Sequence, residues 1–226
     1  MIIGNGLIAN LFKNNDEEKV IFFASGVSNS LETDKSAFLR EENLIRKTLE
    51  ENPEKAFIYF STCSIYDSSK NGSAYVNHKL RMERLVEEFA PKFLILRVSN
   101  AVGKGGNPNL LMNYLVNAII LEKEINIHTL ATRNLIDADD VKNITLEFLR
   151  KNIFNKIINV AYLENFSTTE IIEIIETQLN KKAKTSLVKS GQSYLISIPE
   201  VEVYFQENNL TNKEDYLCRM LDRYYS

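Results

Sequence analysis

A tyrosine and a lysine four residues apart are the strongest candidates for chemistry in this chain, and they are Tyr75 and Lys79. They lie in residues 73–90, whose apolar positions have helical spacing. Residues four apart share one face of a helix, so the phenol and the ammonium are expected to share one space. An ammonium favours the phenolate form of a neighbouring phenol, which then exchanges protons near neutral pH. The alternative, a surface pair, is the more common meaning of an isolated Y-x-x-x-K.

Hydroxyl side chains follow an apolar stretch and form a second candidate group. Thr62, Cys63 and Ser64 come directly after residues 56–61, which are typical of a buried strand. Open α/β sheets bind ligands beyond the carboxyl ends of their strands. Thr62 is therefore a candidate to bind the same substrate oxygen as Tyr75, whereas the alternative is an ordinary Ser/Thr-rich turn.

A glycine-rich turn near the start of the chain is a candidate phosphate site. Two isoleucines precede it, an apolar helical segment follows, and its residues are Gly4, Asn5, Gly6, Leu7 and Ile8. Glycine lets the backbone turn tightly and approach a pyrophosphate, and the following helix start offers free N–H groups. Alone the motif also fits a chance turn, but its strand-to-helix context favours a nucleotide site.

Apolar runs and helical segments alternate along the chain. This alternation predicts an α/β fold with a parallel sheet covered on both faces. We expect a single domain over 1–226, with a small substrate lobe built from about 103–135 and 162–226. Strands are expected at 19–25, 56–61, 93–98, 125–129 and 157–160, and helices at 37–51, 73–90, 109–121, 139–152, 168–179 and 215–225.

Composition excludes several classes of protein. The net charge of -3, from 27 basic and 30 acidic residues, gives no basic excess for a nucleic-acid partner. Two cysteines, Cys63 and Cys218, and two histidines lack zinc or disulfide spacing, so no metal is expected. No apolar run reaches the roughly 18 residues of a membrane span. We therefore expect a cytoplasmic protein that binds neither membrane nor nucleic acid.

Taken in order, these motifs resemble the extended short-chain dehydrogenase/reductase family of NAD-dependent sugar-nucleotide epimerases, dehydratases and reductases. The resemblance runs from residue 1 to about 179. Besides the glycine turn and Y-x-x-x-K, it rests on Phe23–Ser30 (FASGVSNS), Phe60–Tyr66 (FSTCSIY), Leu96–Gly103 (LRVSNAVG), Arg133–Val141 (RNLIDADDV) and Asn159–Ala161 (NVA).

The resemblance implies a Rossmann-like sheet, NAD or NADP as cofactor, and a nucleotide-sugar substrate. It implies a catalytic set of Thr62, Tyr75 and Lys79 in a reductase or epimerase, with surface polysaccharide synthesis as its setting. A dehydratase is less expected, because a carboxylate would then follow Thr62. The family's dimers form through helices that correspond to 37–51 and 73–90, so a homodimer is expected. The implied cofactor-binding residues are Gly4, Asn5, Gly6, Leu7, Ile8, Ala24, Ser25, Gly26, Tyr75, Lys79 and Val98, and the implied substrate-binding residues are Thr62, Cys63, Ser64, Asn100 and Arg133.

The chain departs from the family at its N-terminal half. Only about fifteen residues separate Ala9 from Ala24, where the family has two further strands with their helices. The first interpretation is that these strands are missing, and with them the residue that selects NAD or NADP. The second makes residues 19–25 a true second strand. We favour the first, because residues 24–30 match a later family motif. A shortened half-site also leaves open a non-catalytic sugar-nucleotide or cofactor binder.

Overall fold

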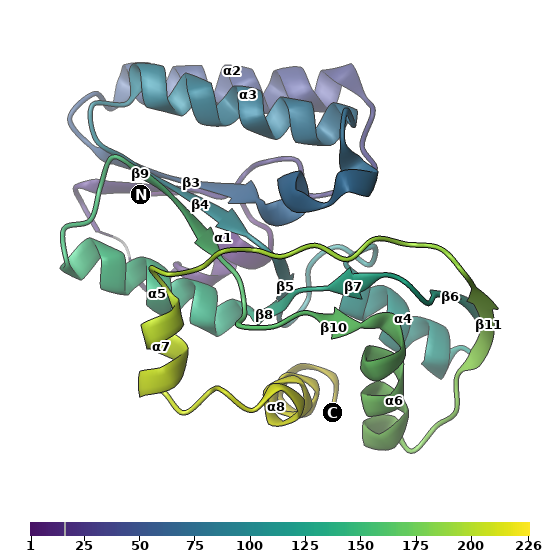
Figure 1. Ribbon diagram of the computed structural model, residues 1–226. Helices are drawn as coiled ribbons and strands as arrows, with labels where there is room; N and C mark the ends of the chain where they lie inside the picture. Colours follow the sequence, from purple (N-terminus) through teal and green to yellow (C-terminus); the bar gives the residue numbers. More distant parts are fainter. Residues whose placement is uncertain (16) are drawn as a thin grey trace.

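A sheet of parallel strands forms the centre of the protein. The computed structural model describes residues 1–15 and 17–226, and within them this sheet has the order β1-β2-β3-β4-β9 (Figure 1). Each neighbouring pair is parallel, so the carboxyl ends of the strands meet at one edge. The strands are β1 (Ile2–Ile3), β2 (Val20–Phe23), β3 (Ala56–Thr62), β4 (Phe93–Val98) and β9 (Lys156–Val160).

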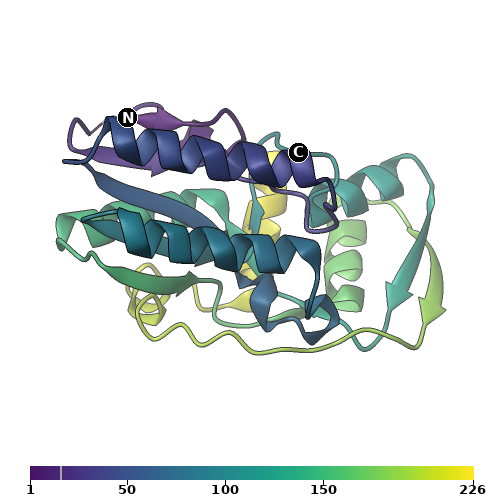
Figure 2. The ribbon, with the colours of Figure 1, turned by 90° about the horizontal axis from the view of Figure 1, so that it is seen from above.

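Helices cover both faces of the sheet (Figures 1 and 2). The strand β2 shows why the central strands are apolar throughout. Its residues Ile21 and Phe23 pack into a hydrophobic cluster on one face of the sheet, and Val20 and Phe22 pack into a second cluster on the opposite face. A strand buried on both faces needs such an uninterrupted apolar run. The covering helices are α2 (Lys35–Glu51) and α3 (Ala74–Phe89) on one face, and α1 (Leu7–Leu11) and α5 (Ala138–Arg150) on the other.

Beyond the carboxyl edge of the sheet, short strand pairs and helices build a smaller lobe (Figure 1). In this lobe β5 pairs with β8 and β6 with β11, both in parallel, and β7 pairs with β10 antiparallel. The strands are β5 (Asn100–Val102), β6 (Glu124–His128), β7 (Thr132–Arg133), β8 (Leu135–Asp137), β10 (Phe166–Ser167) and β11 (Lys184–Val188). The remaining helices are α4 (Leu111–Ile120), α6 (Thr168–Leu179), α7 (Glu202–Glu207), α8 (Lys213–Tyr225) and the 3₁₀ turns η1 (Cys63–Tyr66) and η2 (Ser68–Lys70).

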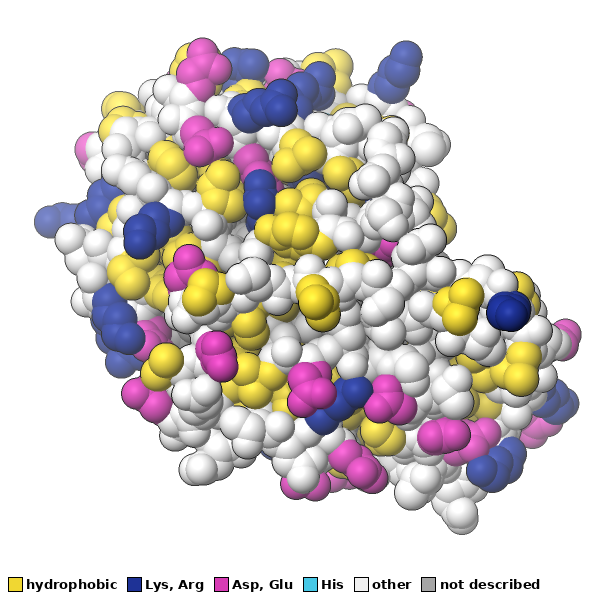
Figure 3. All heavy atoms as spheres, in the orientation of Figure 1, with side chains coloured by type: hydrophobic (Ala, Val, Ile, Leu, Met, Phe, Trp, Pro, Cys, Tyr) yellow, Lys and Arg dark blue, Asp and Glu magenta, His cyan; other side chains and the backbone are white. Residues whose placement is uncertain are grey.

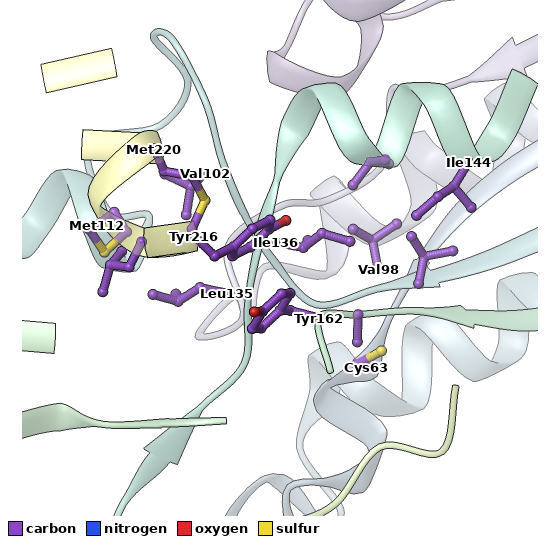
Figure 4. Close-up of a cluster of buried hydrophobic side chains, with 14 of the residues drawn as sticks. Cys63, Val98, Val102, Met112, Leu135, Ile136, Ile144, Tyr162, Tyr216 and Met220 are labelled. Atoms are coloured by element: carbon purple, nitrogen blue, oxygen red, sulfur yellow. The ribbon is translucent and has the colours of Figure 1, made fainter. Parts of the chain in front are cut away.

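One apolar cluster continues from the sheet into this lobe. Figure 4 shows Val98 from the sheet and Tyr162 and Tyr216 from the lobe in the same cluster. The two tyrosine rings stack at 4.0 Å between centroids with an interplanar angle of 7°. Offset stacking of large rings contributes about 0.5–1.5 kcal/mol beyond their area burial. The stack stabilises the lobe itself, and the shared cluster joins the lobe to the strand ends that it faces.

The expected elements up to residue 100 are present, and the later region holds more than the sequence predicted. The helix expected at 73–90 is Ala74–Phe89, and the strand expected at 19–25 is Val20–Phe23. The lobe adds β5, β7, β8, β10, β11 and α7, which we did not predict. These elements have two to six residues, too few for a periodic pattern to indicate them.

The strand order decides between the two interpretations of the N-terminal half. In the family's order, 3-2-1-4-5-6, a true second strand lies on the opposite side of the first strand from the fourth. Here β2 lies between β1 and β3, and β1 is the edge of the described sheet. The run KVIFFAS thus takes the place of the family's fourth strand, which confirms the shortened half.

Candidate active site

A large cleft runs along the carboxyl edge of the sheet. Its volume is about 1110 Å³, above the roughly 300–1,000 Å³ typical of small-molecule sites. The ends of β2, β3 and β4 contribute Ala24, Thr62 and Val98 to its wall, and the lobe contributes Tyr114 and Tyr194. The cleft thus lies where open parallel sheets bind their ligands, and it has room for more than one small molecule.

The helix α3 brings Tyr75 and Lys79 to the floor of this cleft. Ser73 begins the helix by accepting a hydrogen bond from the backbone N–H of Val76 at 3.2 Å. Tyr75 and Lys79 are one turn apart on the buried face, and both side chains line the cleft. The hydroxyl of Tyr75 makes no hydrogen bond with any described residue. It is therefore available to a ligand in the cleft.

Lys79 is held by three groups around it. Its ammonium donates to Oε1 of Glu41 at 3.1 Å and to the carbonyl of Phe60 at 3.1 Å. It also lies 4.5 Å from the ring centroid of Tyr59, a cation–π distance. Its side chain is 2% exposed. Burying a lysine charge is costly unless it is paired, and these contacts supply the pairing.

The glycines of the predicted turn have different surroundings. Gly4 has φ +125°, and a Cβ there would lie 2.4 Å from the carbonyl oxygen of Ala24, so this glycine lets β1 pack against the end of β2. A Cβ on Gly6 would meet no described atom within 4 Å, and Gly6 lines the cleft. The space above Gly6 is therefore open to a ligand. Gly26 is close-packed, because a Cβ there would lie 2.8 Å from Nζ of Lys79.

The hydroxyl group at the end of β3 is partly engaged. The side chain of Thr62 begins the turn η1 by accepting from the N–H of Ser64 at 3.0 Å. The thiol of Cys63 donates to the carbonyl of Arg97 at 2.9 Å, and burial raises its pKa to about 12. Since a thiolate is the reactive form, Cys63 is a packing residue of the cleft wall and no nucleophile.

A second buried carboxylate supports the floor of the site. Glu83 of α3 accepts from Nε of Arg97 at 3.0 Å and from its Nη2 at 2.6 Å, the two-pronged geometry that strengthens such pairs. Ser61 donates to the same carboxylate at 2.5 Å. These bonds join β3, β4 and α3, so they hold the helix that carries Tyr75 against the strand that carries Thr62.

The two residues expected to hold the nucleotide differ in their placement. Asn100 lines the cleft and donates from its side-chain amide to the carbonyl of Asn134 at 2.7 Å. Arg133 does not line the cleft; it donates to the carbonyl of Thr132 at 2.8 Å. Tyr194 does line it. Burial raises the pKa of Tyr194 to about 12, and the nearby positive charge of Arg133 opposes that rise. Arg133 thus lies near Tyr194 but outside the cleft lining.

Two cationic side chains line the cleft. They are Lys79 and Arg40, and within the described chain no carboxylate lines it. The buried carboxylate of Glu41 balances Lys79 from beneath, at 3.1 Å. Arg40 donates to the carbonyl of Ser25 at 3.1 Å and is exposed, and its guanidinium suits an anionic ligand such as a phosphate ester. By contrast, basic and acidic side chains are interspersed over the outer face shown in Figure 3.

Most of the predicted site residues come together in this one cleft. Those that line it are Asn5, Gly6, Leu7, Ile8, Ala24, Ser25, Gly26, Thr62, Cys63, Ser64, Tyr75, Lys79, Val98 and Asn100. Gly4 lies just behind its wall. We did not predict Arg40, Glu41 or Tyr194. A signal for Glu41 existed, because this carboxylate stands in the apolar stripe of its helix with Phe38 and Ile45. Tyr194 lies where no pattern was readable.

A family model matches the part of the chain that carries these motifs. The model, described as "NAD dependent epimerase/dehydratase family", matches residues 4–161, more than half of the 226. The chain belongs to this family. Tyr75, Lys79, the glycine turn and the end of β3 all lie within the matched range. A search of curated protein sequences gave no match.

Solved epimerases and dehydratases share the fold of this family member. A UDP-glucuronic acid 4-epimerase from Bacillus cereus, solved with UDP-glucuronic acid and NAD, has 20% identity and a TM-score of 0.68, over 96% of this chain and 79% of its own. A dTDP-glucose 4,6-dehydratase from Bacillus anthracis str. Ames, solved with NAD, has 18% identity and a TM-score of 0.69, over 96% and 75%. RMD from Pseudomonas aeruginosa, solved with NADPH, has 13% identity and a TM-score of 0.67, over 91% and 80%.

Across the described residues, no helix is both long enough and apolar enough to cross a bilayer. The same residues form no cluster of three or more His, Cys, Asp or Glu side chains that could hold a metal ion.

Proposed function

We propose that the protein is an NAD(P)-dependent reductase or epimerase that acts on a nucleotide-activated sugar. One observation carries the proposal: Thr62, Tyr75 and Lys79 line the same cleft as the glycine turn. The exposed guanidinium of Arg40 at that cleft supports a phosphate-bearing ligand.

The cleft fits the nicotinamide end of such a cofactor. When bound, the cofactor supplies a hydride acceptor or donor. The open space above Gly6 accommodates a phosphate close to the backbone, as the first helix start of such folds does. The wall formed by Ala24, Ser25 and Val98 would hold the nicotinamide and its ribose. The adenosine end of the cofactor has fewer residues to contact, because the described sheet ends at β1.

Each catalytic residue has a task that its surroundings allow. Tyr75 exchanges a proton with the sugar oxygen, and its hydroxyl is available because it bonds to none of the described residues. Lys79 provides fixed positive charge beside it and donates to the ligand. Thr62 orients the same sugar oxygen with its hydroxyl group. Positioned proton transfer of this kind contributes about 10²–10⁴-fold to a rate.

The proposed substrate contacts come from the lobe side of the cleft. Asn100 and Ser64 line it and would bind the sugar nucleotide. Arg133, which lies near Tyr194, would attract its diphosphate. Dehydration is less well supported than reduction or epimerisation. The two residues that follow Thr62 are a buried thiol, Cys63, and the hydroxyl of Ser64, and neither is a carboxylate.

The variant Tyr75→Phe tests the proposal. We expect at least a hundredfold loss of turnover on UDP-sugars or dTDP-sugars, with NADH binding kept, because only the hydroxyl is removed. Reduced cofactor is followed by absorbance and the sugar product by NMR. Tyr114→Phe is the matched control, since Tyr114 also lines the cleft but lies in α4. Unchanged turnover in Tyr75→Phe would remove the enzymatic proposal.

A second candidate is a non-catalytic binder of sugar nucleotides or cofactors. The observation that favours it is the sheet edge at β1, which leaves the adenosine half of a dinucleotide without a second strand. Fluorescence titration with NADH and NADPH separates the candidates. If neither binds while a sugar nucleotide does, the second candidate is favoured.

The proposal also includes a homodimer, a cytoplasmic location and a role in surface polysaccharide synthesis, all drawn from the family resemblance. The expected dimer surface is the outer side of α2 and α3, where Leu39 is 56% and Phe89 51% exposed. Light scattering should then give twice the chain mass of 26.0 kDa. A mass of one chain at micromolar concentration would exclude the dimer.

A further inference from the structure

A fully buried carboxylate, Glu41 of α2, lies directly beneath the cleft. It accepts hydrogen bonds from the backbone N–H of Val27 at 2.7 Å and from the hydroxyl of Tyr59 at 2.6 Å. It also contacts Nε2 of His78 at 2.9 Å and Nζ of Lys79 at 3.1 Å. Its partners therefore come from the loop after β2, from β3 and from α3. One side chain thus ties four segments together.

The carboxylate is saturated by these contacts. An ionised carboxylate has about four acceptor positions, and the four partners use two on each oxygen. Burial alone would raise the pKa of Glu41, but the Lys79 ammonium and the bonds from His78, Tyr59 and Val27 outweigh it. They hold that pKa well below its usual range. Glu41 is therefore a permanent negative charge that balances Lys79.

The geometry leaves one donor of Lys79 for the cleft. An ammonium has three N–H donors. One points to Glu41 and one to the carbonyl of Phe60, at 3.1 Å each. Because Lys79 also lines the cleft, its third donor is the one that a ligand can reach.

The loop over this pair packs closely against both side chains. A Cβ on Gly26 would lie 2.8 Å from Nζ of Lys79 and 2.9 Å from Oε1 of Glu41. The same loop is bonded to Glu41 through the N–H of Val27. The carboxylate of Glu41 thus positions both the cleft wall at residues 26–27 and Lys79 below it.

His78 completes the network on the side away from the cleft. Its Nε2 must carry the proton that it donates to Glu41, and its Nδ1 is buried with no partner among the described residues. The ring stacks on Phe38 at 4.6 Å between centroids. The charged and titratable groups that face Glu41 are therefore His78 and Lys79 from α3 and Tyr59 from β3.

We propose that Glu41 is the positioning residue of this site, which holds Lys79 so that a single N–H faces the ligand and fixes the adjoining wall at 26–27. The identity of that ligand rests on the proposed function, but the positioning itself does not.

The test measures how accessible the amine of Lys79 is. Reductive methylation, quantified for each lysine by mass spectrometry, is run on the full chain well below the melting temperature of each variant. In the wild type we expect Lys79 to react at least tenfold more slowly than Lys47, which is 69% exposed. Glu41→Gln removes the charge that pairs with Lys79 and leaves one acceptor oxygen for two pairs of donors, Val27 with His78 and Tyr59 with Lys79. The amide NH2 group is expected to face Tyr59 and Lys79, because the hydroxyl of Tyr59 can accept from it whereas the N–H of Val27 cannot. Lys79 should then react at least tenfold faster than in the wild type.

Two controls separate positioning from general loosening. Glu42→Gln removes the same charge one residue away, from a carboxylate that pairs with Arg46 and Arg81, and should leave the rate at Lys79 unchanged. The buried thiol of Cys63 should stay unreactive in Glu41→Gln. If the thiol of Cys63 becomes reactive together with the amine of Lys79, Glu41 merely supports the fold and the inference is overturned.

Ligand affinity gives an independent measurement. We expect NADH to bind at least tenfold more weakly to Glu41→Gln, because Lys79 is displaced. The affinity for UDP-glucose should change less than threefold. An unchanged rate at Lys79 would overturn the inference even if NADH binds normally. A wild type that binds no NADH would overturn the proposed function, and the methylation result would still decide the inference.

A milder variant decides the matter if Glu41→Gln does not fold. Tyr59→Phe removes one of the four hydrogen bonds of Glu41 and keeps the buried ring. It should raise the methylation rate of Lys79 about threefold. No change in that rate would contradict the positioning role.

Discussion

Replacing Gly6 by alanine should weaken ligand binding without weakening the fold. The backbone at Gly6 has φ -79° and ψ -171°, which any residue adopts. The added methyl group would meet no described atom within 4 Å and would project into the cleft. The variant therefore separates the ligand-binding role of the turn from its structural role.

Two small effects on stability should nearly cancel. Alanine in place of glycine restricts the unfolded chain, which stabilises by about 0.4–1 kcal/mol. At the start of a helix alanine is less favourable than glycine by about 0.5 kcal/mol. The net change in the free energy of unfolding should stay within about 0.5 kcal/mol. A methyl group forced against a ligand costs about 1–3 kcal/mol. That cost corresponds to roughly 5- to 150-fold weaker binding.

Urea unfolding gives the stability, and NADH fluorescence titration gives the affinity. Gly26→Ala is the matched comparison, because its methyl group would lie 2.8 Å from Nζ of Lys79 and 2.9 Å from Oε1 of Glu41. Overpacking of about 1–3 kcal/mol, less the gain of about 0.4–1 kcal/mol, predicts a net loss near 1–2 kcal/mol. Equal NADH affinity for Gly6→Ala and the wild type would refute the assignment of the turn to the cofactor.

Three further outcomes are expected. Since β1 is the edge of the described sheet, NADH and NADPH should bind with affinities within about threefold of each other in titrations, whereas a tenfold preference would reveal an adenosine site. Burial raises the pKa of Cys63 to about 12, so iodoacetamide at about pH 8 should label Cys218 well before Cys63 in peptide mass spectra, and the reverse order would contradict the buried placement. The folded-state pKa of Glu41 is below its unfolded value near 4.5, so the carboxylate stabilises the fold above that pH, and this stabilisation is lost as the pH falls. Between about pH 6 and 3.5 the melting temperature of Glu41→Gln should therefore fall less than that of the wild type.

The sequence was most informative where chemistry depends on local spacing. Tyr75 and Lys79 are one helical turn apart, and helical periodicity alone predicts that they share a face. The glycine turn and the hydroxyl group after β3 are likewise local patterns. Because parallel strands end at one edge, these separate motifs could be expected in one cleft.

Long-range contacts were beyond reach. Glu41 meets Lys79 across 38 residues of sequence, and periodicity shows only that Glu41 stands on a buried face. Arg133 matches a family motif, yet it does not line the cleft, whereas Tyr194, which comes from a segment without a readable pattern, does. Strands as short as β7 and β10 form because another segment pairs with them, and neither sequence carries a strand signal of its own.

The shortened half of the sheet also determines what the molecule offers to its neighbours. An outermost strand normally displays unpaired amides and carbonyls on which foreign strands can assemble. Here that border is only Ile2–Ile3, so it presents too few such groups to nucleate a ladder. The shortened half thus leaves a blunt margin at β1, and the longer open border of the described sheet is the five-residue strand β9 on the opposite side.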